Sequence, residues 1–355
     1  MKKIIQVTPS ISKGDATSND LLALKDALDS YGIQNAYYAD VIQENAKDLG
    51  VKSFFEYKNK EDDIVIFHFS IMSRFTEYFK NYKGKKWVIY HNVTPHTFFE
   101  EYDDVMVDIC KGSIQNISSL KDTVDLCIAD SEFNKENLIE MGYKCPIEVL
   151  PILIRFSDYD KEANEEIIKK YRGDGYTNIL FTGRVAPNKK QEDIIESFYY
   201  YKKNINEKSR LFIVGGYGKE DKYYKRLKRY VEEIGIEDVI FTGHIPFADI
   251  LGYYRASDIF LCLSEHEGFC VPLVEAMYFG IPIIAYDSTA IKETLGGSGL
   301  LLEDKNPKKV AEAIDIIEKD KDLREKIIEN EKERLEYFSY DNISKKFLDI
   351  LVKYK

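Results

Sequence analysis

The sequence contains few of the residues that mark specialised protein classes. Its 355 residues include 20 glycines, 9 prolines and 5 cysteines, which excludes a collagen-like chain, a linker-rich chain and a disulfide-dense scaffold. The cysteines are odd in number and never spaced as Cys-X-X-Cys, so we expect reduced thiols in a cytoplasmic setting and no structural zinc site. They stand at Cys110, Cys127, Cys145, Cys262 and Cys270.

Long apolar runs are also missing. No segment approaches the ~18 consecutive apolar residues of a membrane-spanning helix. The apolar run near the N-terminus, residues 4–8, is typical of a first strand rather than of a signal peptide. We therefore predict a cytoplasmic protein, with at most a peripheral contact at the inner face of the cell membrane.

A surplus of basic residues is absent as well. The 50 Lys and Arg residues are outnumbered by 61 Asp and Glu residues, a net charge of −11, so nucleic acid is not an expected partner. The contents of 44% hydrophobic and 31% charged residues are typical of a globular protein. The length suits two domains better than one.

Short β-branched and aromatic runs alternate with amphipathic stretches along the whole chain, which predicts an α/β fold with parallel sheets and crossover helices. Strands are expected near residues 4–8, 35–38, 64–68, 87–91, 125–129, 147–150, 178–182, 210–214, 238–241, 258–262, 282–285 and 299–302.

The segment from Pro151 to Tyr176 combines a proline, a charged stretch and the sequence Gly-Asp-Gly, so we place the domain junction there. The last stretch of the chain has apolar residues at helical spacing and needs a surface to cover. The predicted division is an N-terminal domain over 1–155, a linker over 156–176, a C-terminal domain over 177–335 and a final helix over 336–355 that packs back on the N-terminal domain.

The segment richest in candidate functional residues runs from Ser264 to Met277, between a buried strand and a helix. Such a turn directs backbone N–H groups and the positive end of a helix dipole at one point, which suits a phosphate. Glu267 in the turn and Glu275 about one turn into the helix offer acceptors for sugar or ribose hydroxyls. On spacing alone, a solvated Glu267 and a Glu275 that serves the helix dipole are an equally good interpretation.

Two further turns follow strands of the second half. Arg184 and Lys189 lie five positions apart around Pro187, and two such cations can neutralise a diphosphate leaving group. Taken alone, ordinary surface ion pairs are the better interpretation of these two residues. The stretch Gly215-Gly216-Tyr217-Gly218 only loosely resembles a dinucleotide fingerprint, because Asp221 occupies the place of its third glycine. These glycines suit either the close approach of a nucleotide or a tight turn.

In the first half, His68 and His91 each end an apolar strand, where side chains of a parallel sheet reach its ligand-binding edge. A packed histidine is the better interpretation of His68, and for His91 the two interpretations are equal. Gly14 follows the first strand and could bring backbone amides close to a phosphate, although a plain surface turn is the better interpretation of this glycine taken alone.

In chain order, these segments resemble a retaining glycosyltransferase of family 4. That family has the GT-B fold, in which two Rossmann-like domains face each other across a cleft. The resemblance covers nearly the whole chain. It rests on the ordered set Gly183-Arg184…Lys189, Val214-Gly215-Gly216, Phe241-Thr242-Gly243, Glu267-Gly268-Phe269…Pro272…Glu275-Ala276-Met277 and Gly280-Ile281-Pro282-Ile283-Ile284-Ala285.

The resemblance implies roles for individual residues. Arg184 and Lys189 hold the diphosphate of a nucleotide-sugar, Glu275 bonds its ribose, and Glu267 contacts the sugar. His91 matches a first-domain histidine placed near the donor sugar, which makes the catalytic set Glu267, His91, Arg184 and Lys189. The full donor-binding set is Gly14, Arg184, Lys189, Gly215, Gly216, His244, Glu267, Gly268, Phe269, Cys270, Val271 and Glu275.

The implied reaction moves a hexosyl group from a nucleotide-diphosphate sugar with net retention, and with no metal or other cofactor. The stretch 90–95 resembles the subgroup that builds cell-surface polysaccharides, often from mannosyl donors, which implies GDP-mannose as donor. The implied acceptor is a glycan, a lipid-linked glycan or a protein. Ser288-Thr289-Ala290 replaces a Gly-Gly pair that the family often carries, and this departure leaves the sugar contacts there open.

Other functions keep the same fold. A sugar-nucleotide-binding subunit without turnover is the main alternative, and a phosphorylase or epimerase is compatible with the fold alone. A nicotinamide-dependent oxidoreductase would need a complete glycine fingerprint followed by an acidic residue at the end of the next strand, a combination that the sequence does not contain.

Overall fold

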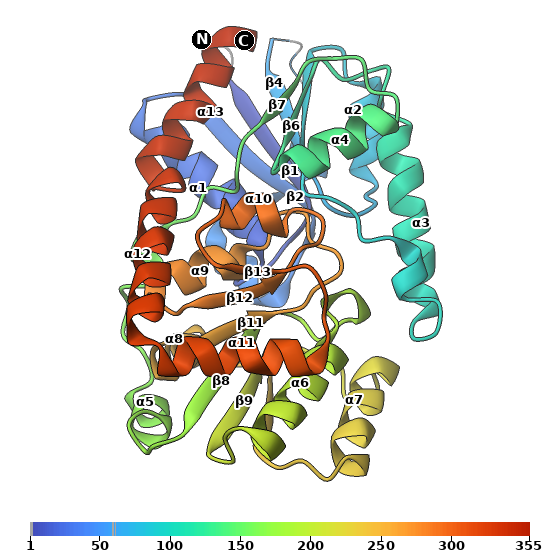
Figure 1. The fold of residues 1–355 in the computed structure, drawn as a ribbon. Coiled ribbons are helices and arrows are strands. Elements are labelled where there is room, and N and C mark those ends of the chain that lie inside the picture. The colour runs from blue at the N-terminus through green and yellow to red at the C-terminus, as the bar shows by residue number, and fades with distance from the viewer. Residues whose placement is uncertain (1–2, 59, 61) are drawn as a thin grey trace. The chain divides into compact units, whose positions relative to one another are not determined.

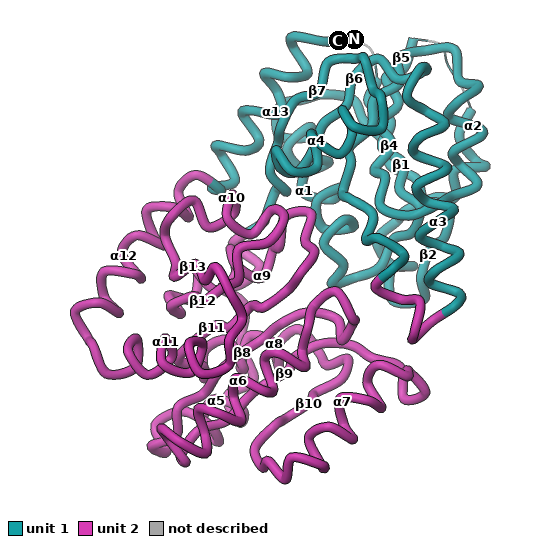
Figure 2. The backbone as a smooth tube through the Cα atoms, turned by 45° about the vertical axis from the view of Figure 1, so that its right-hand side comes forward, with its two compact units in different colours: residues 1–97, 104–155, 338–355 teal, residues 98–103, 156–337 magenta. Residues whose placement is uncertain are grey.

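Two parallel sheets organise the chain, one in each of two compact units (Figure 2). The computed structural model describes residues 3–58, 60 and 62–355. Unit 1 comprises residues 1–97, 104–155 and 338–355, and unit 2 comprises residues 98–103 and 156–337. Among the described residues, no helix combines the length and the hydropathy that crossing a bilayer requires.

Unit 1 is built on a seven-stranded parallel sheet in the order β3-β2-β1-β4-β5-β6-β7 (Figure 1). All six residues of β4, Ile64–Phe69, are buried, as expected for a parallel strand covered on both faces. The other strands are β1 (Ile4–Ile11), β2 (Asn35–Ile42), β3 (Lys52–Ser53), β5 (Lys85–Tyr90), β6 (Leu126–Ala129) and β7 (Ile147–Val149), and the helices of its first two segments are α1 (Ala16–Ser30), α2 (Phe75–Asn81), α3 (Asp104–Ser118) and α4 (Glu132–Glu140).

The last helix, α13 (Tyr340–Tyr354), completes the core of unit 1 although it is separated from the rest of that unit by most of unit 2. Ile343 and Phe347 are fully buried in the same apolar cluster as Trp87 of β5. At its end, Lys85 Nζ donates a hydrogen bond of 2.6 Å to the carbonyl oxygen of Tyr354. The predicted return of the C-terminal helix to the N-terminal domain is therefore confirmed.

Unit 2 is built on a six-stranded parallel sheet in the order β10-β9-β8-β11-β12-β13. Its strands are β8 (Thr177–Thr182), β9 (Ser209–Val214), β10 (Val239–Gly243), β11 (Ile259–Cys262), β12 (Ile283–Tyr286) and β13 (Leu300–Leu302). Its helices are α5 (Glu165–Tyr171), α6 (Gln191–Asn204), α7 (Lys222–Glu233), α8 (Phe247–Ala256), α9 (Val271–Phe279), α10 (Ile291–Leu295), α11 (Pro307–Lys319) and α12 (Lys321–Tyr337). The α/β architecture with two parallel sheets is as predicted.

The units do not follow a single cut in the sequence. Residues 98–103, expected in the N-terminal domain, belong to unit 2, where the Tyr102 ring packs edge-on against Tyr223 at 5.2 Å. The segment 156–176, expected as a linker, carries α5 within unit 2, and there Asn164 donates to Asp249 Oδ1 at 2.8 Å. The short strand β3 is the one strand that the sequence analysis did not predict.

A buried carboxyl group lies under the sheet of unit 2. Glu331 of α12 is fully buried, and its Oε1 accepts a 2.9 Å hydrogen bond from the backbone N–H of Ile283. Its Oε2 has no hydrogen-bond partner in the described part of the chain. Burial raises the pKa of Glu331 to about 8, against a smaller lowering by the Ile283 hydrogen bond.

This carboxyl group makes stability depend on pH. Because the pKa is higher in the folded than in the unfolded state, the stabilisation is complete below the unfolded value of about 4.5 and is lost as the pH rises through about 8. We expect Glu331→Gln to match the wild type at pH 5 and to be more stable by about 2–4 kcal/mol at pH 8.5. Thermal unfolding at both pH values measures this. The exposed Glu329→Gln, on the same helix, is the control and should show no pH-dependent difference.

Candidate functional site

The ligand-binding edge of unit 2 lies where β8 and β11 are neighbours. The chain runs from β8 outward through β9 and β10, and then from β11 outward through β12 and β13 (Figure 1). In such open sheets the turns at the carboxyl ends of the two central strands bind the ligand. The turns after β8, β9, β10 and β11, together with helix α9, carry the residues selected from the sequence in this half.

The turns after β8 and β9 touch through glycine backbone. A Cβ atom at Gly215 would lie 2.0 Å from the carbonyl oxygen of Gly183, so no other residue fits. Gly183 N–H donates to Val214 O at 2.9 Å, and Val185 N–H donates to Gly216 O at 3.0 Å. The glycines therefore allow the two turns to approach each other closely.

An ion pair joins the turn after β8 to the turn after β11. The Lys189 ammonium lies 2.6 Å from Oε1 and 2.5 Å from Oε2 of Glu267, 78 positions further along the chain. The two side chains are only 22% and 9% exposed. Burial by itself lowers the pKa of Lys189, but the charge of Glu267 outweighs it, so the pKa is raised overall. The structure therefore brings together two of the predicted catalytic residues.

Hydrogen bonds hold the backbone around this pair. Asn188 Nδ2 donates to the carbonyl oxygen of His266 at 3.0 Å, next to the ion pair. The backbone N–H of Glu267 donates to Thr289 Oγ1 at 2.9 Å. Thr289 belongs to the Ser-Thr-Ala stretch that departs from the family pattern, so this departure supplies a contact to the candidate catalytic turn.

Arg184 differs from Lys189 in being exposed. Its own carbonyl oxygen accepts a 3.1 Å hydrogen bond from Gln191 Nε2, which holds the backbone of the turn. His244, another predicted donor-binding residue, is exposed as well, and its Cβ would lie 3.9 Å from a Cβ at Gly216. Arg184 and His244 thus flank the glycine contact and present their side chains to solvent.

Helix α9 begins directly after the candidate turn. Cys270 precedes its first residue with φ of 74°, a left-handed conformation that is costly for a residue other than glycine. Phe269 and Cys270 are buried, whereas Val271 is partly exposed. The N-terminus of this nine-residue helix follows the turn of Glu267, and the positive end of its dipole favours a phosphate there.

Glu275 of α9 is held by two tyrosines. Tyr254 donates to its Oε2 at 2.6 Å, and Tyr159 donates to its Oε1 at 2.9 Å. Tyr254 also shares a 2.6 Å hydrogen bond with Thr182, the last residue of β8. Burial raises the pKa of Glu275, although both phenol hydrogen bonds act in the opposite direction. The sequence analysis missed both tyrosines, because nothing in their spacing separates them from the other 24 in the chain.

The predicted first-half residues lie in unit 1. Gly14 has φ of +82° in the exposed turn after β1, and a Cβ atom at this position would have no other atom within 4 Å. The His91 side chain is only 3% exposed, with Nδ1 2.9 Å from Asp130 Oδ2 and Nε2 3.1 Å from His68 Nδ1. Burial lowers the pKa of His91 and the charge of Asp130 raises it, and the net result is a rise to about 8. Its assignment as a catalytic residue stays a prediction.

Two clusters of the described residues have the donor atoms for a metal ion. In unit 2, the donor atoms of Cys262, Glu267 and Cys270 lie within 4.8 Å of one another. The Lys189 ammonium already contacts both oxygens of Glu267. Its positive charge would repel a metal ion bound at the same carboxylate. The other cluster is Asp20, His68 and His91 of unit 1.

Comparison with known proteins finds similarity in the same half of the chain. A family model described as glycosyl transferases group 1 matches residues 162–334, which lie within unit 2. The chain is 27% identical over 205 residues to alpha-monoglucosyldiacylglycerol synthase of Streptococcus pneumoniae, covering 54% of this chain and 45% of that protein. It is 25% identical over 187 residues to O-antigen chain mannosyltransferase B of Escherichia coli, covering 51% and 48%. The matches thus span about half the length of these curated relatives.

Solved structures match over the whole chain. Sucrose-phosphate synthase from Thermosynechococcus elongatus has a TM-score of 0.76 at 16% identity and covers 99% of both chains. HepE from Anabaena, solved in complex with UDP-glucose, has a TM-score of 0.77 at 17% identity and covers 99% of this chain and 100% of its own. These likenesses show the fold. The chain therefore has the GT-B fold, and its residues 162–334 match the family model of glycosyl transferases group 1.

Proposed function

We propose that this protein is a retaining glycosyltransferase that moves a hexosyl group from a nucleotide-diphosphate sugar to a glycan or lipid-linked glycan acceptor during cell-surface polysaccharide synthesis. The observation that carries the proposal is the Lys189–Glu267 ion pair at the carboxyl ends of β8 and β11, one turn before the start of α9. The match of residues 162–334 to a glycosyltransferase family model supports it. The mannosyl relative and the UDP-glucose complex of HepE suggest GDP-mannose and UDP-glucose as the first donors to test.

Departure of the nucleotide diphosphate puts growing negative charge on the β-phosphate. Arg184, exposed in the turn after β8, offers a planar fork of donors to that group. The positive end of α9 lies at the turn of Glu267 and stabilises the same charge. Lys189 has three N–H donors, and its contacts to Glu267 occupy no more than two of them. These groups meet the charge of the leaving group, so we propose that the transfer needs no divalent cation.

Glu267 is the residue proposed to act on the reacting sugar. Lys189 and the Thr289 hydrogen bond hold its carboxylate and its backbone in place. A fixed carboxylate at this position can accept a hydrogen bond from a sugar hydroxyl and offset the positive charge that develops on the ring. With no nucleophile assigned to the enzyme, we propose a front-face displacement in which the departing phosphate takes the proton of the acceptor hydroxyl.

Glu275 is proposed to bind the ribose. Its two phenol hydrogen bonds occupy one lone pair on each oxygen and leave other acceptor sites for ribose hydroxyls. Tyr254 and Tyr159 fix the direction in which those sites point. Because the ribose does not take part in bond making or breaking, this contact acts chiefly on donor affinity.

The alternative is a sugar-nucleotide-binding subunit without turnover. Both functions require nucleotide binding in unit 2, and only the enzyme releases free nucleotide diphosphate. The first experiment therefore screens the full chain for thermal stabilisation by UDP, GDP, UDP-glucose and GDP-mannose, and then measures nucleotide release from the stabilising donor. We expect stabilisation by one base family and slow release that continues in excess chelator. Stabilisation without release, with acceptor glycans present, would favour the binding subunit, and release restored only by magnesium or manganese would overturn metal independence.

The cations of the turn after β8 should have different effects on folding. Arg184→Ala removes an exposed side chain, so we expect kcat to fall about 10²–10³-fold with the unfolding temperature unchanged. Lys189→Ala leaves the carboxylate of Glu267 buried and unpaired, so it should lower both kcat and thermal stability. Steady-state kinetics and thermal unfolding measure the two effects. The neighbouring Lys190→Ala is the control, and Arg184→Ala with wild-type kcat would remove Arg184 from the proposal.

The two glutamates should separate rate from affinity. We expect Glu267→Gln to lower the single-turnover rate about 10²-fold or more while the affinity for the free nucleotide diphosphate changes less than about threefold. Glu275→Gln should mainly weaken nucleotide binding, by about tenfold. Tyr254→Phe provides a matched control, because it removes one hydrogen bond to Glu275 and should weaken binding in the same direction. Equal losses of affinity in both glutamate variants would contradict this division of roles.

A further inference from the structure

Two cysteines of unit 1 lie side by side at the edge of its sheet. Cys127 is the second residue of β6, and Cys145 stands in the turn that leads into β7. Their Sγ atoms are 3.7 Å apart, which is van der Waals contact between two sulfur atoms. The residues are 18 positions apart in the chain, so the absence of a Cys-X-X-Cys motif from the sequence does not exclude a dithiol.

Strand pairing brings the two cysteines together. β6 and β7 are parallel neighbours, with Cys127 beside Ile147, and the N–H of Cys127 donates to the carbonyl oxygen of Pro146 at 3.0 Å. β7 is the last strand in the order of the sheet, and its three residues are all partly exposed. All four residues of β6 are buried. The dithiol therefore joins a buried strand to a turn at the edge of the sheet.

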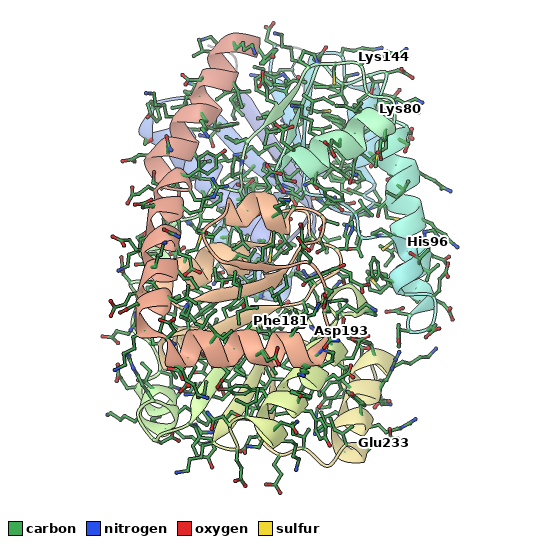
Figure 3. The ribbon with its side chains drawn as sticks, viewed as in Figure 1. Lys80, His96, Lys144, Phe181, Asp193 and Glu233 are labelled. Carbon is green, nitrogen blue, oxygen red and sulfur yellow. The ribbon has the colours of Figure 1, made fainter. Side chains whose placement is uncertain are left out.

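The two thiols differ in their access to solvent. Cys127 is fully buried, whereas Cys145 is partly exposed and follows the exposed Lys144, which is labelled in Figure 3. Burial raises the pKa of Cys127, and the hydrogen bond with Cys127 lowers the pKa of Cys145. The thiolate, which is the reactive form, is thus favoured on the thiol that a dissolved oxidant reaches first.

We propose that Cys145 and Cys127 form a reversible oxidation site, in which Cys145 reacts with a peroxide and Cys127 then closes a disulfide. An accessible thiol next to a second, resolving thiol is the arrangement of redox-sensing cysteines. A disulfide bond of about 2.05 Å requires the two sulfurs to approach by roughly 1.7 Å. The turn of Cys145 can supply this movement, because it lies at the edge of the sheet and contains Gly142 with φ of 89°.

The reaction balances with one peroxide per disulfide. The Cys145 thiolate attacks one oxygen of hydrogen peroxide, the O–O bond breaks, and the other oxygen takes up a proton and leaves as water. Cys145 is then a sulfenic acid. The Cys127 sulfur displaces the hydroxyl group, which leaves as water with the proton of Cys127. Two thiols are thereby oxidised and the peroxide is reduced, and a small thiol such as dithiothreitol reverses the step by exchange.

Unit 2 contains a second pair of cysteines that differs in exposure. The sulfurs of Cys262 and Cys270 lie within 4.8 Å of each other, but both residues are buried. Neither of them is as open to a dissolved oxidant as Cys145. The proposal therefore concerns the pair in unit 1, and it does not rest on the proposed transfer reaction.

The experiment treats the reduced full chain with a roughly tenfold excess of hydrogen peroxide, blocks the remaining thiols and digests with trypsin. Trypsin cleaves after Lys135 and Lys144, which leaves the two cysteines in separate peptides, 122–135 and 145–155. We expect mass spectrometry to find these peptides joined, and dithiothreitol to separate them. Residues 262–270 contain no lysine or arginine, so a disulfide between Cys262 and Cys270 would stay within one peptide and is distinguishable.

Three variants test the order of the reaction. Cys145→Ser, at a partly exposed position, should leave Cys127 as a free thiol after peroxide. Cys127→Ser should leave a sulfenic acid on Cys145 that dimedone traps, and should raise the yield of its sulfinic acid at least about fivefold, because the resolving thiol is missing. Cys110→Ser, in the buried cysteine of α3, is the control and should form the joined peptides like the wild type.

Three results would overturn the proposal. They are peptides 122–135 and 145–155 that stay separate in the oxidised wild type, oxidation of Cys127 in Cys145→Ser, and equal yields of sulfinic acid in Cys127→Ser and the wild type. Because Cys127 is buried, its replacement can impair folding. The wild type and Cys145→Ser decide the test without that variant.

Discussion

The ion pair between Lys189 and Glu267 is the contact on which the arrangement of unit 2 depends. It joins the turn after β8 to the turn after β11, and these strands are neighbours only because the sheet reverses its order between them. The pair is mostly buried, so neither partner can be removed without leaving an unpaired charge. The same contact fixes the carboxylate of Glu267 before any ligand arrives. Helix α9 then begins at Val271, shortly after a carboxylate whose position is already set, and Arg184 is exposed in the same turn as Lys189.

Each unit also contains a buried carboxyl group that is held by aromatic or imidazole partners. Glu275 accepts from two tyrosines, and Asp130 from His91. Phenols and imidazoles are rigid and carry polar atoms at the edge of an apolar ring, so they satisfy a carboxylate without bringing a long flexible chain into the core. Glu331 differs from them, because its second oxygen has no hydrogen-bond partner among the described residues. Burial therefore raises the pKa of Glu331.

The two units are each assembled from separated pieces of the chain. Unit 1 is completed by α13, whose apolar face fills the same core as β5, and unit 2 takes in residues 98–103 from the first half. Neither unit therefore corresponds to one continuous range of residues. Asp193 of α6, labelled in Figure 3, shows the same principle on a smaller scale, because it pairs with Lys305 from beyond β13.

The sequence alone determined most of the architecture and the turns that carry the candidate site. The strands, the helix that starts after Cys270, the glycine turns and the returning C-terminal helix are set by local patterns of burial and turn formation, and such patterns are visible within a dozen residues. The partners of the functional groups were not visible. Tyr159 and Tyr254 reach Glu275 across 116 and 21 positions, and Gln6 lies 62 positions from His68. Only the order of strands in the sheets decided which of many tyrosines and carboxylates would meet, because hydrogen bonds between distant residues depend on where the folded backbone places them and not on their spacing in the chain.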